Sequence, residues 1–328
     1  MAGEMATTPR ASTTPAVQVG SMAISELIAF VIMLVALILG PFYAYSFFLM
    51  QAMCFAMFAM AFNLLVGYVG LLSFGHAMFM GLASYAAAHA AKVWGLTPEL
   101  AILVGVASAV GLGFIVGVLA IRRQGIYFTM ITLALAQMVY FFCLRAPFTH
   151  GEDGIQMVPQ GKLFGIIDLT NATTLYYVVV AIFCLAFAIV HRTVNSPFGE
   201  ILKAIRENEP RAISLGFRTE RYKLAAFVLS AALAGLAGGL KAIVVQSASL
   251  TDVHWSMSGE VVLMTLVGGL GTMFGPIAGA FAIVAMQNYF AELGSWVTVI
   301  QGGIFVVCVL TFRRGVIGEI AHLIGKPL

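Results

Sequence analysis

The sequence predicts an all-α polytopic membrane protein. Hydrophobic residues make up 61% of the chain and charged residues only 9%, and the mean hydropathy is +1.00. Soluble domains carry roughly 25% charged residues. The apolar runs are long and unbroken instead of alternating over about 10 residues, which favours helices over a β-barrel. Because only helices and closed barrels satisfy every backbone polar group in lipid, we expect a helical bundle.

We expect about ten transmembrane spans, with eight to ten as the plausible range of roughly 20-residue segments, some of them short or broken. Together they form one membrane domain at residues 23–318, between tails at 1–22 and 319–328. The first tail is rich in Thr, Ala and Pro and has no apolar core, so we expect it to be disordered and not a secretory signal. The expected spans are 23–40, 43–66, 71–91, 99–121, 126–145, 174–192, 222–247, 256–271, 274–292 and 295–312.

The basic residues predict the orientation, because cytoplasmic loops carry an excess of Lys and Arg. With both termini in the cytoplasm, three basic residues fall outside: Lys92, Arg145 and Lys162. Lys241 falls within a span, where it either snorkels to the interface or serves a function. The other thirteen lie on the cytoplasmic side: Arg10, Arg122, Arg123, Arg192, Lys203, Arg206, Arg211, Arg218, Arg221, Lys223, Arg313, Arg314 and Lys326.

The long polar interruption at residues 193–223 is therefore expected in the cytoplasm. Ser196 and Pro197 form a good helix start, a capping residue followed by proline in the first turn. Pro210 then ends or kinks the helix. Such an amphipathic helix either lies on the lipid surface or docks into a partner. Four residues at helical spacing make its apolar face: Phe198, Ile201, Leu202 and Ile205.

The largest outside loop, residues 146–173, is too short to form a folded domain. Its Glu152-Asp153-Gly154 sequence is typical of a turn with exposed carboxylates. The loop is either simply solvated, or Glu152 and Asp153 contact an external partner.

Two glycine-punctuated stretches, residues 65–76 and 266–276, resemble each other. Each contains Val-Gly-x-x-Gly followed by Phe-Gly. In lipid, such clusters either allow close helix packing or break a helix where its backbone lines a cavity. Polar residues beside the first stretch favour a broken helix on a transport path, which makes Asn63, Ser73 and His76 candidate path residues.

Few polar groups are expected at membrane depth, and ionisable residues there tend to face the interior or a cavity. Glu260 begins a span, so it lies either on the transport path or at the span boundary. His76 has no second ligand at helical spacing, so packing is favoured over metal binding. The polar set is Asn63, His76, His89, Gln137, Lys241, Glu260, Gln287 and Asn288.

No catalytic or cofactor motif occurs in the sequence. It contains no Gly-x-x-x-x-Gly-Lys-Ser/Thr, no Gly-x-Ser-x-Gly and no His-Glu-x-x-His. The four cysteines lie in apolar runs without Cys-x-x-Cys spacing, so we expect buried apolar residues. We therefore expect no enzyme and no metal or cofactor. The net charge of +3 gives no reason to expect a nucleic-acid partner.

Residues 63–77, with the sequence NLLVGYVGLLSFGHA, resemble the signature of permease subunits of branched-chain amino acid ABC importers, the LivH/LivM family. The resemblance covers about residues 60–318, and the order and spacing of its motifs make it specific. The Gly151–Gly154 loop and the Arg-Gly near the C-terminus are more similar to the M-type subunit. The further matching motifs are Ser196-Pro197-Phe198-Gly199, Gly216, Gly268–Gly271, Gly275-Pro276 and Arg314-Gly315.

The resemblance implies that residues 193–223 hold a coupling helix that docks into a groove of a separate ATPase subunit, which binds the ATP. It also implies a second, LivH-like permease, with the solute passing between the two. A periplasmic solute-binding protein would deliver the solute near Glu152 and Asp153. The location would be the bacterial inner membrane, in contact with lipid. The loop residues that match the family pattern are Gly199, Ala204, Arg206, Glu207, Asn208 and Gly216.

Three other hypotheses compete with that of an importer of branched-chain or similar amino acids. The first is a permease for urea or short-chain amides, which relatives in the same family import. A stand-alone channel or secondary transporter would need no ATPase, but for ion coupling it would be expected to carry more intramembrane carboxylates than Glu260 alone. A structural membrane subunit would have no path of its own.

Overall fold

The computed structural model describes residues 24–123, 125–165, 167–294, 296–311, 315, 318 and 319. The expected tail at 1–22 lies outside the described residues, as does all of the expected tail at 319–328 except Glu319. Both therefore stay predictions. Arg313 and Arg314 also lie outside the described residues.

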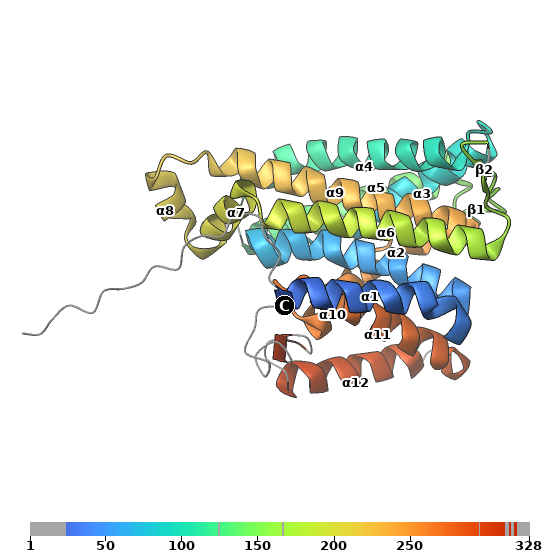
Figure 1. Ribbon diagram of the computed structural model, residues 1–328. Helices are drawn as coiled ribbons and strands as arrows, with labels where there is room; N and C mark the ends of the chain where they lie inside the picture. The colour runs from blue at the N-terminus through green and yellow to red at the C-terminus, as the bar shows by residue number, and fades with distance from the viewer. Residues whose placement is uncertain are drawn as a thin grey trace, which may run out of the picture.

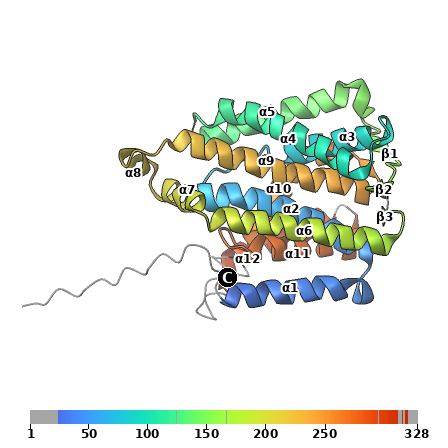
Figure 2. The same ribbon diagram turned by 45° about the horizontal axis from the view of Figure 1, so that its top comes forward.

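The described chain is a bundle of helices that run roughly parallel to one axis (Figures 1 and 2). The α-helices are α1 Ile24–Tyr43, α2 Ser46–Asn63, α3 Ala77–Lys92, α4 Pro98–Ala120, α5 Ile126–Arg145, α6 Ala172–Val194, α7 Pro197–Glu207, α8 Glu209–Ser214, α9 Thr219–Val244, α10 Trp255–Gly268, α11 Gly275–Tyr289 and α12 Trp296–Thr311. A π-helix, η1 Leu64–Val69, continues α2, and 3₁₀ turns lie at η2 Pro147–Thr149, η3 Leu250–Asp252 and η4 Ala291–Leu293.

The membrane character is confirmed, while the number of spans is not. Within the described residues, five helices are long and apolar enough to cross a membrane: Ser46–Val69, Pro98–Ala120, Ile126–Arg145, Ala172–Val194 and Thr219–Val244. The helices other than α7 and α8 follow the ten expected segments in order. However, α3, α10 and α11 have only 16, 14 and 15 residues. A full span needs about 20 residues, so these three are shorter than a standard span.

Helix α2 forms the centre of the bundle. In an 18-residue apolar window of α2 and η1, 94% of the residues are buried, and α2 packs against α6, α9, α10 and α11. Its sequence of Phe, Met and Ala has no polar face, and a helix that is apolar on all sides is buried. Helices α3, α4 and α9 form a second tight group through small residues. For example, a Cβ at Gly105 would lie 2.7 Å from the Ala83 carbonyl oxygen. Small residues let membrane helices approach this closely.

The two ends of the bundle differ. Helices α7 and α8 lie at one end, where α1 also begins and α12 ends, while the short strands lie at the other (Figures 1 and 2). Strand β1 Ile155–Gln156 pairs antiparallel with β4 Ser247–Ala248, and β2 Lys162–Leu163 pairs with β3 Ile167–Asp168. The loops expected inside and outside are therefore at opposite ends. Which end faces the cytoplasm stays a prediction: from the charge distribution we expect it to be the α7 end.

Candidate functional site

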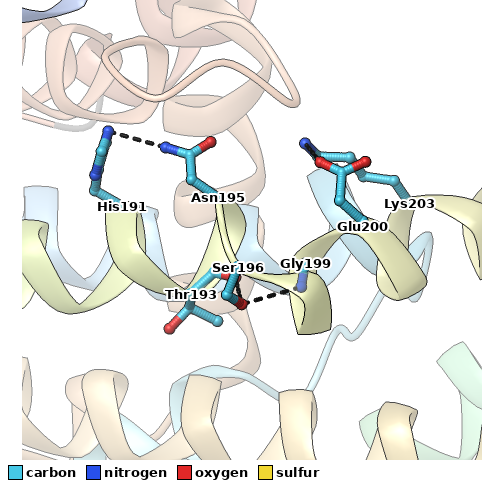
Figure 3. Close-up of polar contacts among 7 residues, drawn as sticks. All are labelled: His191, Thr193, Asn195, Ser196, Gly199, Glu200 and Lys203. Carbon is cyan, nitrogen blue, oxygen red and sulfur yellow. Dashed lines mark hydrogen bonds and ion pairs between the residues drawn. The ribbon is translucent and has the colours of Figure 1, made fainter. Parts of the chain in front are cut away.

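Helix α7 begins at a sharply defined corner after α6 (Figure 3). The Ser196 hydroxyl accepts a hydrogen bond from the Gly199 amide at 3.3 Å and donates one to the Thr193 carbonyl at 2.6 Å. Pro197 occupies the first turn, where its missing N–H costs nothing. Gly199 is required by space, because a Cβ there would lie 2.1 Å from the Val194 carbonyl oxygen. The predicted helix start is confirmed.

The apolar face of α7 packs on the chain itself. Leu202 and Ile205 are buried, and Phe198 and Ile201 are half-buried. The ring of Phe198 lies 5.8 Å from that of Tyr222 on α9. The amphipathic pattern suggested the lipid surface or a partner for the apolar face, whereas in the structure this face packs against the chain's own bundle. The opposite face carries the exposed Glu200, Ala204 and Glu207 and the half-buried Lys203, and the exposed Asn208 follows at the end of the helix.

Helix α8 adds an apolar tip that the sequence reading missed. Ile213 is 55% exposed and Leu215 is 70% exposed, next to the exposed Gly216. Asn208 caps α8 by accepting a hydrogen bond from the Arg211 amide at 3.0 Å. Glu209 and Lys223 form an ion pair at 2.5 Å that ties α8 to α9. Ile213 and Leu215 are apolar residues in a polar loop, and they lie outside the buried stripe of α7. This pattern in the sequence could have identified the tip.

Arg206 reaches from α7 to both glycine-punctuated stretches. Its Nη1 donates a hydrogen bond to the Gly67 carbonyl. A Cβ on Gly70 would lie 3.2 Å from the Arg206 Cγ, and one on Gly271 would lie 3.4 Å from Nη1. Arg206, Gly67 and Gly271 line a hollow of about 420 Å³, together with Tyr68, Lys203 and Glu207.

The two stretches touch each other through Asn63. Its Nδ2 donates to the Thr272 carbonyl at 2.9 Å, and its Oδ1 accepts from the Gly271 amide at 2.9 Å. A Cβ on Gly67 would lie 2.9 Å from the Gly271 nitrogen, so glycine is needed for this approach. Both stretches also interrupt helices, since η1 ends at Val69 and α10 ends at Gly268. We call Asn63, Gly67, Gly70, Gly271 and Thr272 the glycine node.

The polar residues Ser73 and His76 of the first stretch lie in the core of the subunit. His76 is fully buried, with Nε2 at 3.0 Å from the Ser230 hydroxyl and its ring among Phe58, Phe62 and Phe79. Ser73 is also fully buried and accepts from the Gly75 amide at 3.3 Å. Among the described residues, no group of three or more His, Cys, Asp or Glu could hold a metal ion. The path role of Asn63, Ser73 and His76 stays a prediction.

Glu260 differs from these three, because it is only half-buried. It lies on α10 and accepts a hydrogen bond from Gln287 on α11 at 3.1 Å. Nearby in the same half of the bundle, Lys241 forms an ion pair with Asp252, and both side chains are buried. Lys241 therefore points into the protein and does not snorkel. Asp252 was not singled out by the sequence, because nothing in the loop 245–254 showed that it folds back onto α9.

The outside loop presents acidic and apolar groups together. Glu152 and Asp153 are exposed, as the sequence predicted for the turn. Met157 is 85% exposed and Phe164 is 71% exposed on the same loop. Asp168 accepts hydrogen bonds from the Thr170 amide at 3.0 Å and the Thr170 hydroxyl at 2.8 Å, which lower the pKa of Asp168. Contact with an external protein stays a prediction.

Comparison with known proteins places the chain in a family. A family model described as the permease component of branched-chain amino acid transport systems matches residues 44–309. The chain is 26% identical over 288 residues to the high-affinity branched-chain amino acid transport system permease protein LivM of Escherichia coli, covering 81% of this chain and 68% of that protein. LivM of Salmonella typhimurium is 27% identical over 292 residues, with the same coverage.

A more distant relative is the ribose import permease protein RbsC of Bacillus subtilis. It is 27% identical over 238 residues, covering 68% of this chain and 70% of that protein. No solved structure matches the chain. Since the family model covers most of its length, the chain belongs to the family of permease components of branched-chain amino acid transport systems.

Proposed function

We propose that this chain is the transmembrane subunit of an ATP-driven importer of branched-chain or similar amino acids, located in a bacterial inner membrane. The observation that carries the proposal is the arrangement at the cytoplasmic end. Leu202 and Ile205 are buried and fix helix α7 to the bundle, while Glu200, Glu207 and the apolar tip of α8 are exposed. Helix α8 projects from the end of the bundle (Figure 1). A helical pair held rigidly and presented in this way suits docking to a separate protein.

The docking partner would be an ATPase subunit. The sequence contains no P-loop motif of its own, so a membrane subunit driven by ATP needs a second chain to bind the nucleotide. The docking surface that we propose differs from the one the helical pattern suggested. It consists of polar-face residues of α7, the following Asn208 and the α8 tip, all exposed except the half-buried Lys203: Glu200, Lys203, Ala204, Glu207, Asn208, Ile213 and Leu215.

The transport path would lie along α5, α10 and α11. Gln137 on α5, Glu260 on α10 and Gln287 on α11 are half-buried polar residues at membrane depth. Helices α5 and α10 are neighbours, since the rings of Tyr140 and His254 lie 5.3 Å apart. Polar side chains facing lipid are costly, so this face suits a second permease and a solute between the two subunits. With one half-buried carboxylate, it suits a zwitterionic or neutral solute.

The choice of solute rests on the relatives. The LivM relatives named for branched-chain amino acid transport match over 81% of this chain, and the relative named for ribose import matches over 68%. We therefore favour branched-chain amino acids. At the other end of the bundle, Glu152, Asp153, Met157 and Phe164 form an exposed surface that suits a periplasmic binding protein delivering the solute.

Co-purification tests the proposed docking surface. The chain, tagged, would be expressed with its co-encoded ATPase and second permease, and the amount of bound ATPase measured. We expect the double variant Ile213→Glu, Leu215→Glu to bind about tenfold less ATPase than the wild type, because it puts two charges into an apolar contact. The matched control is Met157→Glu, an exposed apolar residue at the opposite end. Equal capture by the double variant and the control would contradict this surface.

A further inference from the structure

The glycine node joins α2 to the consecutive helices α10 and α11, about 200 residues further along the chain. Asn63 ends α2, while Gly271 and Thr272 lie between α10 and α11. The two 2.9 Å hydrogen bonds of Asn63 lock these segments together. Helix α10 carries Glu260 and packs along α11 over their length. A displacement of the node would therefore move the helices that we propose to line the path.

Arg206 provides a direct polar link from α7 to this node. The Gly67 carbonyl lies in the last turn of η1, where helix carbonyls lack partners within the helix. A cation is favoured at such a C-terminus, and a hydrogen bond from a charged donor is stronger than a neutral one. The aliphatic part of Arg206 lies over Gly70, and its guanidinium lies beside Gly271. One side chain thus contacts both halves of the node.

The attachment of α7 does not depend on this link. Leu202 and Ile205 are buried, and the Ser196 cap fixes the corner with α6. The guanidinium adds a contact with the point where α2, α10 and α11 meet.

We propose that Arg206 is the positioning residue that transmits movement of α7 to the glycine node, and through it to α10 and α11. This inference rests on the proposed function, because it takes α7 as the element that the ATPase moves. Arg206 then determines how much transport results from each ATP hydrolysed, and it contributes little to ATPase binding.

The experiment uses the complete transporter in proteoliposomes, with its ATPase, second permease and solute-binding protein. Arg206→Met keeps the aliphatic packing on Gly70 and removes the guanidinium. Arg206→Lys keeps a charged donor. The matched control is Arg192→Met, which removes an exposed arginine from the last turn of α6 at the same end of the bundle. Bound ATPase, ATP hydrolysis and solute uptake are measured for each variant.

We expect Arg206→Met to bind ATPase and hydrolyse ATP at the wild-type level, with uptake per ATP reduced about tenfold. Arg206→Lys should recover part of that loss, and Arg192→Met should couple as the wild type does. If Arg206→Met takes up as much solute per ATP as the wild type, or if it loses ATPase binding, this inference is overturned while the proposed function stands. Failure of the wild-type chain to bind any ATPase would overturn the proposed function, and this inference with it.

Discussion

Lys241 and Asp252 form a buried ion pair that connects α9 to the loop that follows it. Lys241 lies on α9, and its Nζ is 5.2 Å from the centre of the Phe55 ring on α2. Asp252 belongs to the short turn η3 in the next loop. Burying either charge alone is costly, whereas a close buried pair offsets much of that cost. The pair therefore pins the loop between α9 and α10 against the central helix.

Removing one member of this pair should be worse than removing both. We expect Lys241→Met to lower the free energy of unfolding by about 3–5 kcal/mol, because it leaves the Asp252 carboxylate buried without a partner. The double variant Lys241→Met, Asp252→Asn should recover most of that loss. The measurement is thermal unfolding of the purified protein in detergent. A double variant as unstable as the sum of the two single variants would contradict a structural pair.

Glu260 should affect transport more than stability. Glu260→Gln keeps the size and the hydrogen-bonding capacity toward Gln287 but removes the charge. If Glu260 lies on the path, we expect the KM for uptake of a zwitterionic solute to rise by roughly tenfold, because one charge contact is lost. The ATPase should remain bound. Unchanged uptake kinetics would place Glu260 outside the path.

Helix α7 has two different faces, an apolar face packed on the bundle and a polar face on the opposite side. Its amphipathic spacing and its Ser-Pro start were predictable from the sequence, and the structure confirms both. The direction of the apolar face was not predictable, because a stripe of four apolar residues suits a foreign groove and the chain's own bundle equally well. The tight corner at Gly199 decides the matter, since it folds α7 back against η1 and α9.

Shortening the buried stripe should loosen α7. We expect Leu202→Ala to cost about 2–5 kcal/mol, the usual range for deleting a fully buried leucine side chain. Ile213→Ala serves as the comparison, because Ile213 is 55% exposed and its loss should leave stability nearly unchanged. Thermal unfolding of both variants provides the measurement. Equal stability of Leu202→Ala and wild type would show that the stripe does not hold α7.

The meeting of two distant segments explains what the sequence could not show. The likeness between residues 65–76 and 266–276 was visible, and either packing or helix breaks could account for it. In the structure both apply, because the stretches interrupt helices and also pack against each other through Asn63. Sequence spacing gives no information on contacts across about 200 residues, so neither the node nor its link to Arg206 was predictable.

For the whole molecule, the order of the apolar segments was predictable from hydropathy, and their lengths were less so. Helices α3, α10 and α11 are shorter than a standard span. One glycine-containing stretch precedes α3, and the other separates α10 from α11. The orientation stays a prediction from the distribution of Lys and Arg, because the geometry does not provide it.

Cysteine labelling in intact cells tests that orientation. We expect Asp153→Cys to react with a membrane-impermeant maleimide from outside, and Leu215→Cys to react only after the cells are permeabilised. Both positions are exposed, whereas the native Cys54 and Cys143 are buried. The unmodified chain provides the background signal. Labelling of Leu215→Cys in intact cells would reverse the assigned orientation.

Uptake of labelled leucine by proteoliposomes that hold the complete transporter tests most directly whether this chain is a subunit of an ATP-driven importer. We expect uptake that requires the ATPase subunits, ATP and the solute-binding protein, and that is lost in the Ile213→Glu, Leu215→Glu variant. Uptake at the same rate by this chain without ATPase, driven by an ion gradient, would contradict this expectation.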